Sequence, residues 1–209
     1  MTAVLIHLCE RNAVIAADTL AIGLDSYRGT VSKIQALPHL GVLLAMTGNL
    51  RVASSLYEHM NGGGFDGIRE NHATASVLRR RWNEVWDEQG WCHSTTVFVV
   101  GAQHGYIVAG RYRSPDFEPE LLDVPSVIGL PFAPGLEPLT KSARGARDYA
   151  RLIAYQRAHQ PSVQIGDTVC VATLRGSGSI HFTAPLSCPG MSVVYEETTV
   201  AAAEPVART

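Results

Sequence analysis

The sequence lacks the features of a membrane-spanning or secreted protein. No apolar run approaches the roughly 18 consecutive residues that a membrane span requires. The first residues have neither the basic start nor the unbroken apolar core of a signal peptide, because His7, Glu10, Arg11 and Asn12 interrupt them. We therefore expect a soluble, cytoplasmic protein without membrane contact.

The sequence also lacks an excess of charge of either sign. Its 17 basic and 19 acidic residues give a formal net charge of −2, which provides no reason to expect a polyanionic partner. The single basic run, Arg79 to Arg81, lies inside a helical pattern with Trp82 and Trp86. This pattern is typical of a solvated helix face, so we expect no nucleic-acid partner.

Motifs for metals, cofactors and histidine-dependent catalysis are missing as well. The four cysteines are widely spaced without a CxxC pair, and the eight histidines do not cluster. The chain contains no P-loop, no HExxH and no GxSxG. We expect no metal and no organic cofactor.

What the sequence does contain is a composition typical of one large folded domain. Apolar residues make up 46% and charged residues 17% of the 209 residues, which excludes a disordered chain and a coiled coil. We expect a single domain over residues 1–195. Residues 196–209 are rich in Ala and have no hydrophobic period, so we expect this tail to fray.

The order of apolar patterns favours an α+β fold. Strands are expected at 3–9, 13–17, 33–37, 41–46, 95–100, 106–109, 168–174 and 179–183, and helices at 50–60, 73–89 and 141–159. Residues 18–32 are polar, and residues 111–139 are proline-rich and loop-like. This order lacks the regular strand–helix alternation of a doubly wound parallel sheet and suits antiparallel sheets with helices packed outside them.

Thr2 is open to two interpretations. It can be an ordinary threonine at the start of a strand. Alternatively, removal of Met1 exposes an α-amine, with an ordinary pKa of about 7.7–8.0, beside the Thr2 hydroxyl. That amine can act as a base for its own hydroxyl, which then becomes a nucleophile without any histidine.

Three further residues supply what such a nucleophile needs. Lys33 offers a cation that favours the neutral amine, and Asp18, at the end of an apolar run, offers a carboxylate to orient that cation. Gly48 follows a buried strand and precedes a helix, where its backbone N–H can stabilise an oxyanion.

These residues carry a resemblance to a known family. The stretches "TAV", "VIAADT", "SKI" and "GVLLAMTGN" over residues 2–60 resemble the proteasome β-subunit family and its bacterial HslV-type and Anbu-type relatives, and "GDTVCVATL" resembles a late strand of that family. The family belongs to the N-terminal-nucleophile hydrolases. The resemblance implies a four-layer α-β-β-α sandwich and a homo-oligomer, stacked as rings or a helical turn, that encloses polypeptide substrates. It leaves open whether an ATPase unfoldase feeds that chamber.

The resemblance also implies roles for single residues. Thr2 matches the nucleophile and general base, Asp18 the acidic residue that positions the lysine, Lys33 that lysine, and Gly48 the oxyanion-hole glycine. Asp167 is the candidate for a further supporting carboxylate. Leu130, in "VIGLPF", stands where the family usually has a serine that assists the amine.

The sequence thus predicts a threonine-type N-terminal-nucleophile endopeptidase that acts through Thr2. Two alternatives stay open. One is a small-amide hydrolase on the same fold, and the other is a catalytically silent assembly protein, which Leu130 in place of the serine would suit.

Overall fold

The computed structural model describes residues 3–22, 28–63, 72–187 and 197–200 of the chain. Within these residues the chain forms an α+β fold of antiparallel sheets, as the element order predicts. The elements are β1 (Val4–Cys9), β2 (Asn12–Asp18), β3 (Leu20–Ile22), β4 (Arg28–Thr30), β5 (Ile34–Leu37), a short 3₁₀ helix (Pro38–Leu40), β6 (Val42–Thr47), α1 (Leu50–Asn61), α2 (His72–Gln89), β7 (Thr96–Gln103), β8 (Tyr106–Arg113), β9 (Glu120–Leu121), β10 (Ser126–Leu130), α3 (Leu136–Ser142), α4 (Ala146–His159), β11 (Thr168–Arg175), β12 (Ile180–Ser187) and β13 (Glu197–Val200).

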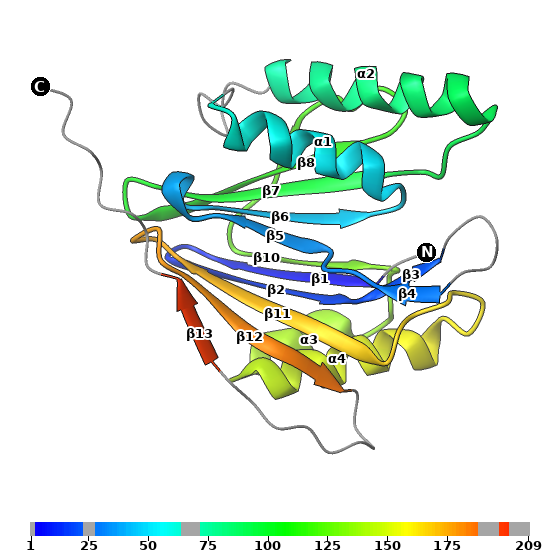
Figure 1. Ribbon diagram of the computed structural model, residues 1–209. Coiled ribbons are helices and arrows are strands. Elements are labelled where there is room, and N and C mark those ends of the chain that lie inside the picture. Colours follow the sequence, from blue (N-terminus) through cyan, green and yellow to red (C-terminus); the bar gives the residue numbers. More distant parts are fainter. Residues whose placement is uncertain (1–2, 23–27, 64–71, 188–196, 201–209) are drawn as a thin grey trace, which may run out of the picture.

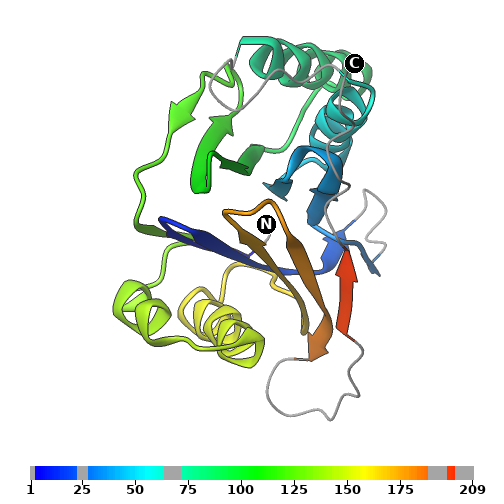
Figure 2. The same ribbon diagram turned by 90° about the vertical axis from the view of Figure 1, so that its left-hand side faces the viewer.

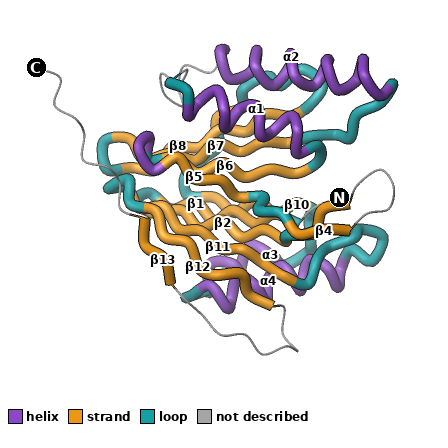
Figure 3. Tube along the Cα trace, viewed as in Figure 1, coloured by secondary structure: helices purple, strands orange, loops and turns teal. Residues whose placement is uncertain are grey.

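The described strands form two large sheets and one small ribbon. The six-stranded sheet has the order β10-β1-β2-β11-β12-β13, and the five-stranded sheet has the order β5-β6-β7-β8-β9. Strands β3 and β4 pair only with each other. Figure 3 separates these strands from the helices by colour.

The two large sheets lie one above the other, with helices on their outer sides. Helices α1 and α2 lie over the five-stranded sheet, and α3 and α4 lie under the six-stranded sheet (Figure 1). The view turned by 90° gives the same arrangement (Figure 2). Each helix pair shares a cluster of buried apolar side chains with the sheet that it covers.

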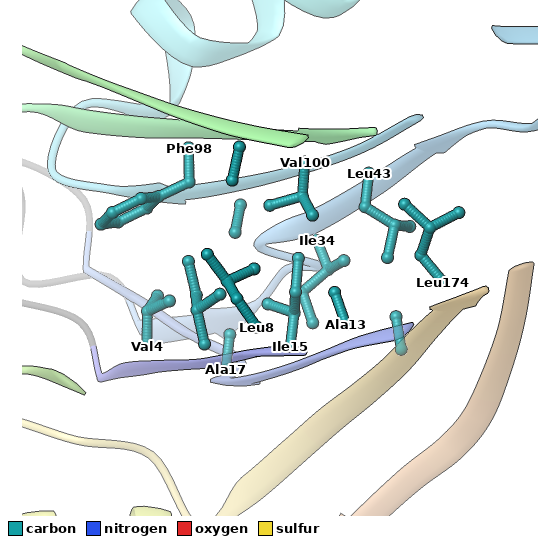
Figure 4. Close-up of a cluster of buried hydrophobic side chains, with 14 of the residues drawn as sticks. Val4, Leu8, Ala13, Ile15, Ala17, Ile34, Leu43, Phe98, Val100 and Leu174 are labelled. Carbon is teal, nitrogen blue, oxygen red and sulfur yellow. The ribbon is translucent and has the colours of Figure 1, made fainter. Parts of the chain in front are cut away.

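A third apolar cluster fills the space between the sheets. Figure 4 shows side chains from β1 and β2, including Val4, Leu8 and Ile15, facing Leu43 and Phe98 of the other sheet. Strand β1 is apolar on both faces for this reason. Its even-numbered residues 4, 6 and 8 contact the other sheet, whereas Ala3 and Leu5 pack in the cluster that includes α4. The two-sided burial predicted from the near absence of alternation in residues 3–17 is confirmed.

The structure differs from the expected elements in the proline-rich middle of the chain. Residues 126–130 of the expected loop form β10, which pairs antiparallel with β1. The expected helix over residues 141–159 is two helices, because Ala143 is extended and Gly145 caps α4 with an extended backbone. Short strands such as β10 have weak periodicity when they lie at a sheet edge and are half-buried on both faces.

Two stretches to which no strand was assigned from the sequence also contain strands. The polar segment 18–32 contains β3 and β4. Residues 197–200, in the tail that we expected to fray, pair with β12. Within the described residues, no helix combines the length and the hydropathy needed to cross a bilayer.

Candidate active site

A buried ion pair joins the two sheets. The Nζ atom of Lys33, just before β5, lies 3.1 Å from Oδ1 and 3.0 Å from Oδ2 of Asp18, at the end of β2. The side chains are 2% and 0% exposed, respectively. An ion pair so deeply buried is not a surface contact that salt would screen, and its geometry is fixed by the protein around it.

Backbone amides complete the coordination of the Asp18 carboxylate. Ala3 N–H donates to Oδ1 at 2.7 Å, and the N–H groups of Leu20 and Gly166 donate to Oδ2 at 3.2 Å and 3.0 Å. The carboxylate therefore accepts hydrogen bonds from three backbone amides, two of them distant in sequence, in addition to the lysine. Charge-assisted bonds of this kind hold both oxygens in one orientation.

The first of these amides is important because of its position in the chain. Ala3 is fully buried, and its carbonyl oxygen accepts a hydrogen bond of 3.1 Å from the N–H of Asp18. Ala3 and Asp18 are thus joined in both directions. The start of β1 is held against the carboxylate that holds Lys33.

The environment of Lys33 acts on its protonation. Burial lowers the pKa of Lys33 from its ordinary value, and the neighbouring Asp18 carboxylate opposes that shift by attraction and by hydrogen bonding. The lysine thus combines a desolvated amine with a charge partner. This combination is common at functional sites.

Gly48 forms a tight turn between β6 and α1. Its backbone has φ +89°, and a Cβ there would lie 2.1 Å from the carbonyl oxygen of Ser94 and 2.7 Å from Cα of Thr95. The next residue, Asn49, donates its N–H to Thr95 Oγ at 3.0 Å and caps α1 by accepting from Arg51 N–H. Both the backbone conformation and the lack of space require glycine at position 48.

Antiparallel pairing brings these segments to one end of the two sheets. β1 begins where β2 ends, since Val4 pairs with Ala17. In the other sheet Met46 N–H donates to Lys33 O at 3.1 Å, so β6 reaches its last residues beside the lysine. The turn at Gly48 follows two residues later.

The structure therefore brings together Asp18, Lys33, the start of β1 and the end of β6, which the Gly48 turn follows. Thr2, the predicted nucleophile, lies outside the described residues. Asp167 is not part of this group, because its side chain is 75% exposed and forms an ion pair with Arg157.

Leu130, the residue at the expected serine position, lies next to the site. It is the last residue of β10 and pairs with Val4, two residues after Thr2 in the sequence. At its neighbour Gly129 a Cβ would lie 2.3 Å from Leu136 Cδ2, so a side chain there would require Leu136 to move. Within the described part of β10, the polar side chain is that of Ser126, at the opposite end of the strand.

Sequence reasoning missed the backbone donors of the site. Gly166, next to the candidate Asp167, contributes its N–H to Asp18, and a Cβ at Gly166 would lie 2.8 Å from Leu20 Cβ. The signal available was the glycine that precedes β11, because a glycine before a strand often marks a close approach of two backbone segments.

Comparison with known proteins supports the fold. No protein-family model and no curated protein matches this sequence. Among solved structures, Anbu from Hyphomicrobium sp. strain MC1 superposes with a TM-score of 0.63 at 14% identity, covering 90% of this chain and 88% of that chain. A mutant of the same protein gives a TM-score of 0.63 at 17% identity, with coverage of 91% and 89%.

A third structure, the Anbu (ancestral beta-subunit) of Yersinia bercovieri, has a TM-score of 0.60 at 14% identity and covers 84% of this chain and 82% of that chain. The chain therefore has the fold of the ancestral β-subunit Anbu over most of its length. At these identities the similarity concerns the fold, and the chemistry has to be argued from the site.

Proposed function

We propose that this protein is a proteasome-like threonine peptidase with an N-terminal nucleophile. The observation that carries the proposal is the buried Asp18–Lys33 pair held against the amide of Ala3. The peptide bond joins Ala3 to Thr2, and consecutive Cα atoms are about 3.8 Å apart. The Asp18 carboxylate is thus hydrogen-bonded to the residue that directly follows the proposed nucleophile.

In the proposed reaction, removal of Met1 frees the α-amine of Thr2. The Thr2 hydroxyl attacks the carbonyl carbon of a peptide substrate while the amine takes the hydroxyl proton. The tetrahedral intermediate collapses to an ester with Thr2 as the C–N bond of the substrate breaks, and the Thr2 ammonium gives its proton to the amine of the leaving peptide. The Thr2 amine, neutral again, then takes a proton from water, which attacks the ester. Release of the second product returns that proton to the Thr2 hydroxyl.

Lys33 and Asp18 act by electrostatics in this scheme. A cation near the Thr2 amine lowers the pKa of that amine and keeps it unprotonated at neutral pH. Because Asp18 holds the lysine from both of its oxygens, the cation keeps its position throughout the reaction. Such preorganised charge needs no rearrangement when the transition state forms.

Gly48 is the proposed oxyanion donor. Its turn lies at the end of β6, directly before α1, where the partial positive charge of the helix N-terminus adds to the N–H dipole. The turn packs closely against the backbone of Ser94 and Thr95, which leaves this peptide unit little space to change its conformation.

The proposed class includes an assembly. We propose that the two sheets and their helix pairs are the four-layer α-β-β-α sandwich of N-terminal-nucleophile hydrolases, and that copies of the chain form a homo-oligomer, ring or helical, around a chamber for polypeptides. An ATPase unfoldase is a candidate partner for such a chamber.

A second candidate function is a catalytically silent assembly protein. The position of Leu130, paired with Val4 beside the site, favours it. A leucine side chain cannot donate or accept a hydrogen bond, so the step that a serine hydroxyl would assist has no side-chain partner from this position.

The test combines mass, labelling and activity. We expect purified protein to lack the mass of one methionine and to form a single adduct on Thr2 with an electrophile selective for N-terminal threonine. Thr2→Ala should abolish peptide hydrolysis and labelling, Thr2→Ser should retain part of both, and Ser142→Ala, which removes an exposed hydroxyl on α3, should change neither.

Oligomer size is measured on the same samples. A processed wild type that assembles but neither labels nor cleaves peptides would contradict the peptidase and support the silent assembly protein. A monomer that cleaves small amides but not peptides would support the small-amide hydrolase instead.

A further inference from the structure

An open surface depression of about 750 Å³, with mostly exposed lining residues, lies at the end of the sheets away from Asp18. Three hairpin turns surround it, namely β1–β2, β7–β8 and β11–β12, which meet at the left of Figure 1. Strand β2 begins at this depression with Asn12 and ends at Asp18. At about 3.3 Å per residue, the two ends of β2 are roughly 20 Å apart, so this distal pocket is separate from the candidate active site.

The turns around the distal pocket are joined by backbone contacts. Ile107 N–H donates to the carbonyl oxygen of Glu10 at 2.8 Å, and Gly176 N–H donates to that of Arg11 at 2.7 Å. A Cβ at Gly176 would lie 2.1 Å from the carbonyl oxygen of Gly105. Backbone contacts therefore fix the three turns around the distal pocket relative to one another, and with them the Cα positions of the lining residues.

The lining is basic. Arg11, Arg175 and His104 line the distal pocket, and none of its lining residues is acidic. No carboxylate of the described residues forms an ion pair with Arg11 or Arg175. By contrast, Arg79 and Arg111 each pair with a glutamate.

Neutral groups add to the binding capacity of the distal pocket. Asn12 and Ser177 contribute an amide and a hydroxyl, and Tyr106 contributes an aromatic ring that is 53% exposed. The volume is large enough for a small molecule, which this open depression would leave partly exposed to solvent. Guanidinium groups bind phosphate and carboxylate oxygens in pairs, and they stack on flat groups.

We propose that the distal pocket binds a small molecule with a doubly charged oxyanion, a phosphate monoester or a dicarboxylate, held between Arg11 and Arg175. Two unpaired guanidinium groups match two negative charges. Tyr106 provides a surface for the remainder of the molecule. This site is independent of the proposed peptidase activity.

The test is calorimetric titration of the full-length protein with inorganic phosphate and, separately, with succinate, at constant ionic strength set by chloride. We expect saturable binding of at least one of the two anions. Arg11→Gln and Arg175→Gln should each weaken it about ten- to hundredfold, the effect of losing charge-assisted hydrogen bonds. The matched control is Arg28→Gln, which removes the same charge from exposed strand β4 and should leave the affinity unchanged.

Amide chemical shifts locate the bound anion. The resonances of Gly105 and Gly176 should move on titration in the wild type and stay in place in Arg175→Gln. Phosphate binding alone assigns the pocket to phosphate esters, and succinate binding alone assigns it to dicarboxylates. The proposal is overturned if neither anion binds, or if Arg28→Gln weakens binding as much as the two pocket variants do.

Discussion

Replacing Lys33 by methionine removes the cation of the buried pair and keeps a side chain of similar length. The Asp18 carboxylate then retains three backbone donors but loses both contacts to Nζ. Breaking a buried ion pair at one partner costs about 3–5 kcal/mol, because the remaining charge stays desolvated. We expect Lys33→Met to lower the free energy of unfolding by that amount.

Urea denaturation at fixed protein concentration measures this effect, and the midpoint should fall by roughly 1–2 M. The matched control is Lys141→Met, which breaks an exposed pair with Glu137 and should cost less than about 1 kcal/mol. If the two variants lost equal stability, the view that burial makes the Asp18–Lys33 pair important would be refuted.

A double-mutant cycle isolates the interaction between the two side chains. Asp18→Asn alone places an NH2 group opposite backbone N–H donors, because both carboxylate oxygens accept such bonds. The double variant removes both charges, so it should lose at least about 2 kcal/mol less than the sum of the single variants. Additive losses would contradict direct coupling.

Three further predictions concern other parts of the fold. Gly48→Ala should lower the free energy of unfolding, measured by urea denaturation, by about 3 kcal/mol or more. The control is Gly63→Ala, which should cost only about 1–2 kcal/mol because Gly63 has the same φ of +89° but nothing within 4 Å of its Cβ. Equal losses would contradict the steric argument. Burial and Lys141 lower the pKa of His7 from 6.5, so its NMR titration midpoint should lie below 6.5 and should rise in Lys141→Met. The free energy of unfolding should fall as the pH drops below 6.5, because the unfolded chain then binds more protons. A midpoint at or above 6.5 would be the contrary result. Burial raises the pKa of Tyr149 to about 12, so its contribution to the free energy of unfolding should be lost as the pH rises from about 10 to 12. In Tyr149→Phe the free energy of unfolding, measured across this interval, should depend less on pH.

The sequence predicted those parts of the fold that rest on strong local patterns. Strands β1, β2 and β6 are long apolar runs, and α1 has both helical spacing and the capping residue Asn49. Such segments are buried in any compact fold, so whether they form a strand or a helix can be predicted from the local sequence. Strand β10 could not be, because its half-buried residues become a strand only through pairing with β1.

The same distinction applies to the candidate site. Asp18 and Lys33 could be named because they stand at the end of one apolar run and the start of the next expected strand, in stretches that resemble the proteasome β-subunit family, and the structure places them in contact. The Gly166 amide could not be named, since a backbone donor has no residue-specific signature and its role depends on a contact 148 residues away in the sequence. The role of Thr2 stays a prediction.

The two sheets share a layer of apolar side chains that has no directional contacts of its own and could slip. At one border of that layer the Asp18–Lys33 pair connects the sheets, and at the other the Ile107–Glu10 main-chain bond does so. Sliding of one sheet over the other would have to break both the ion pair and the backbone hydrogen bond. The alignment of β1 with the Gly48 turn therefore depends on both sheets together, and a displacement of one sheet relative to the other would change the position of that turn.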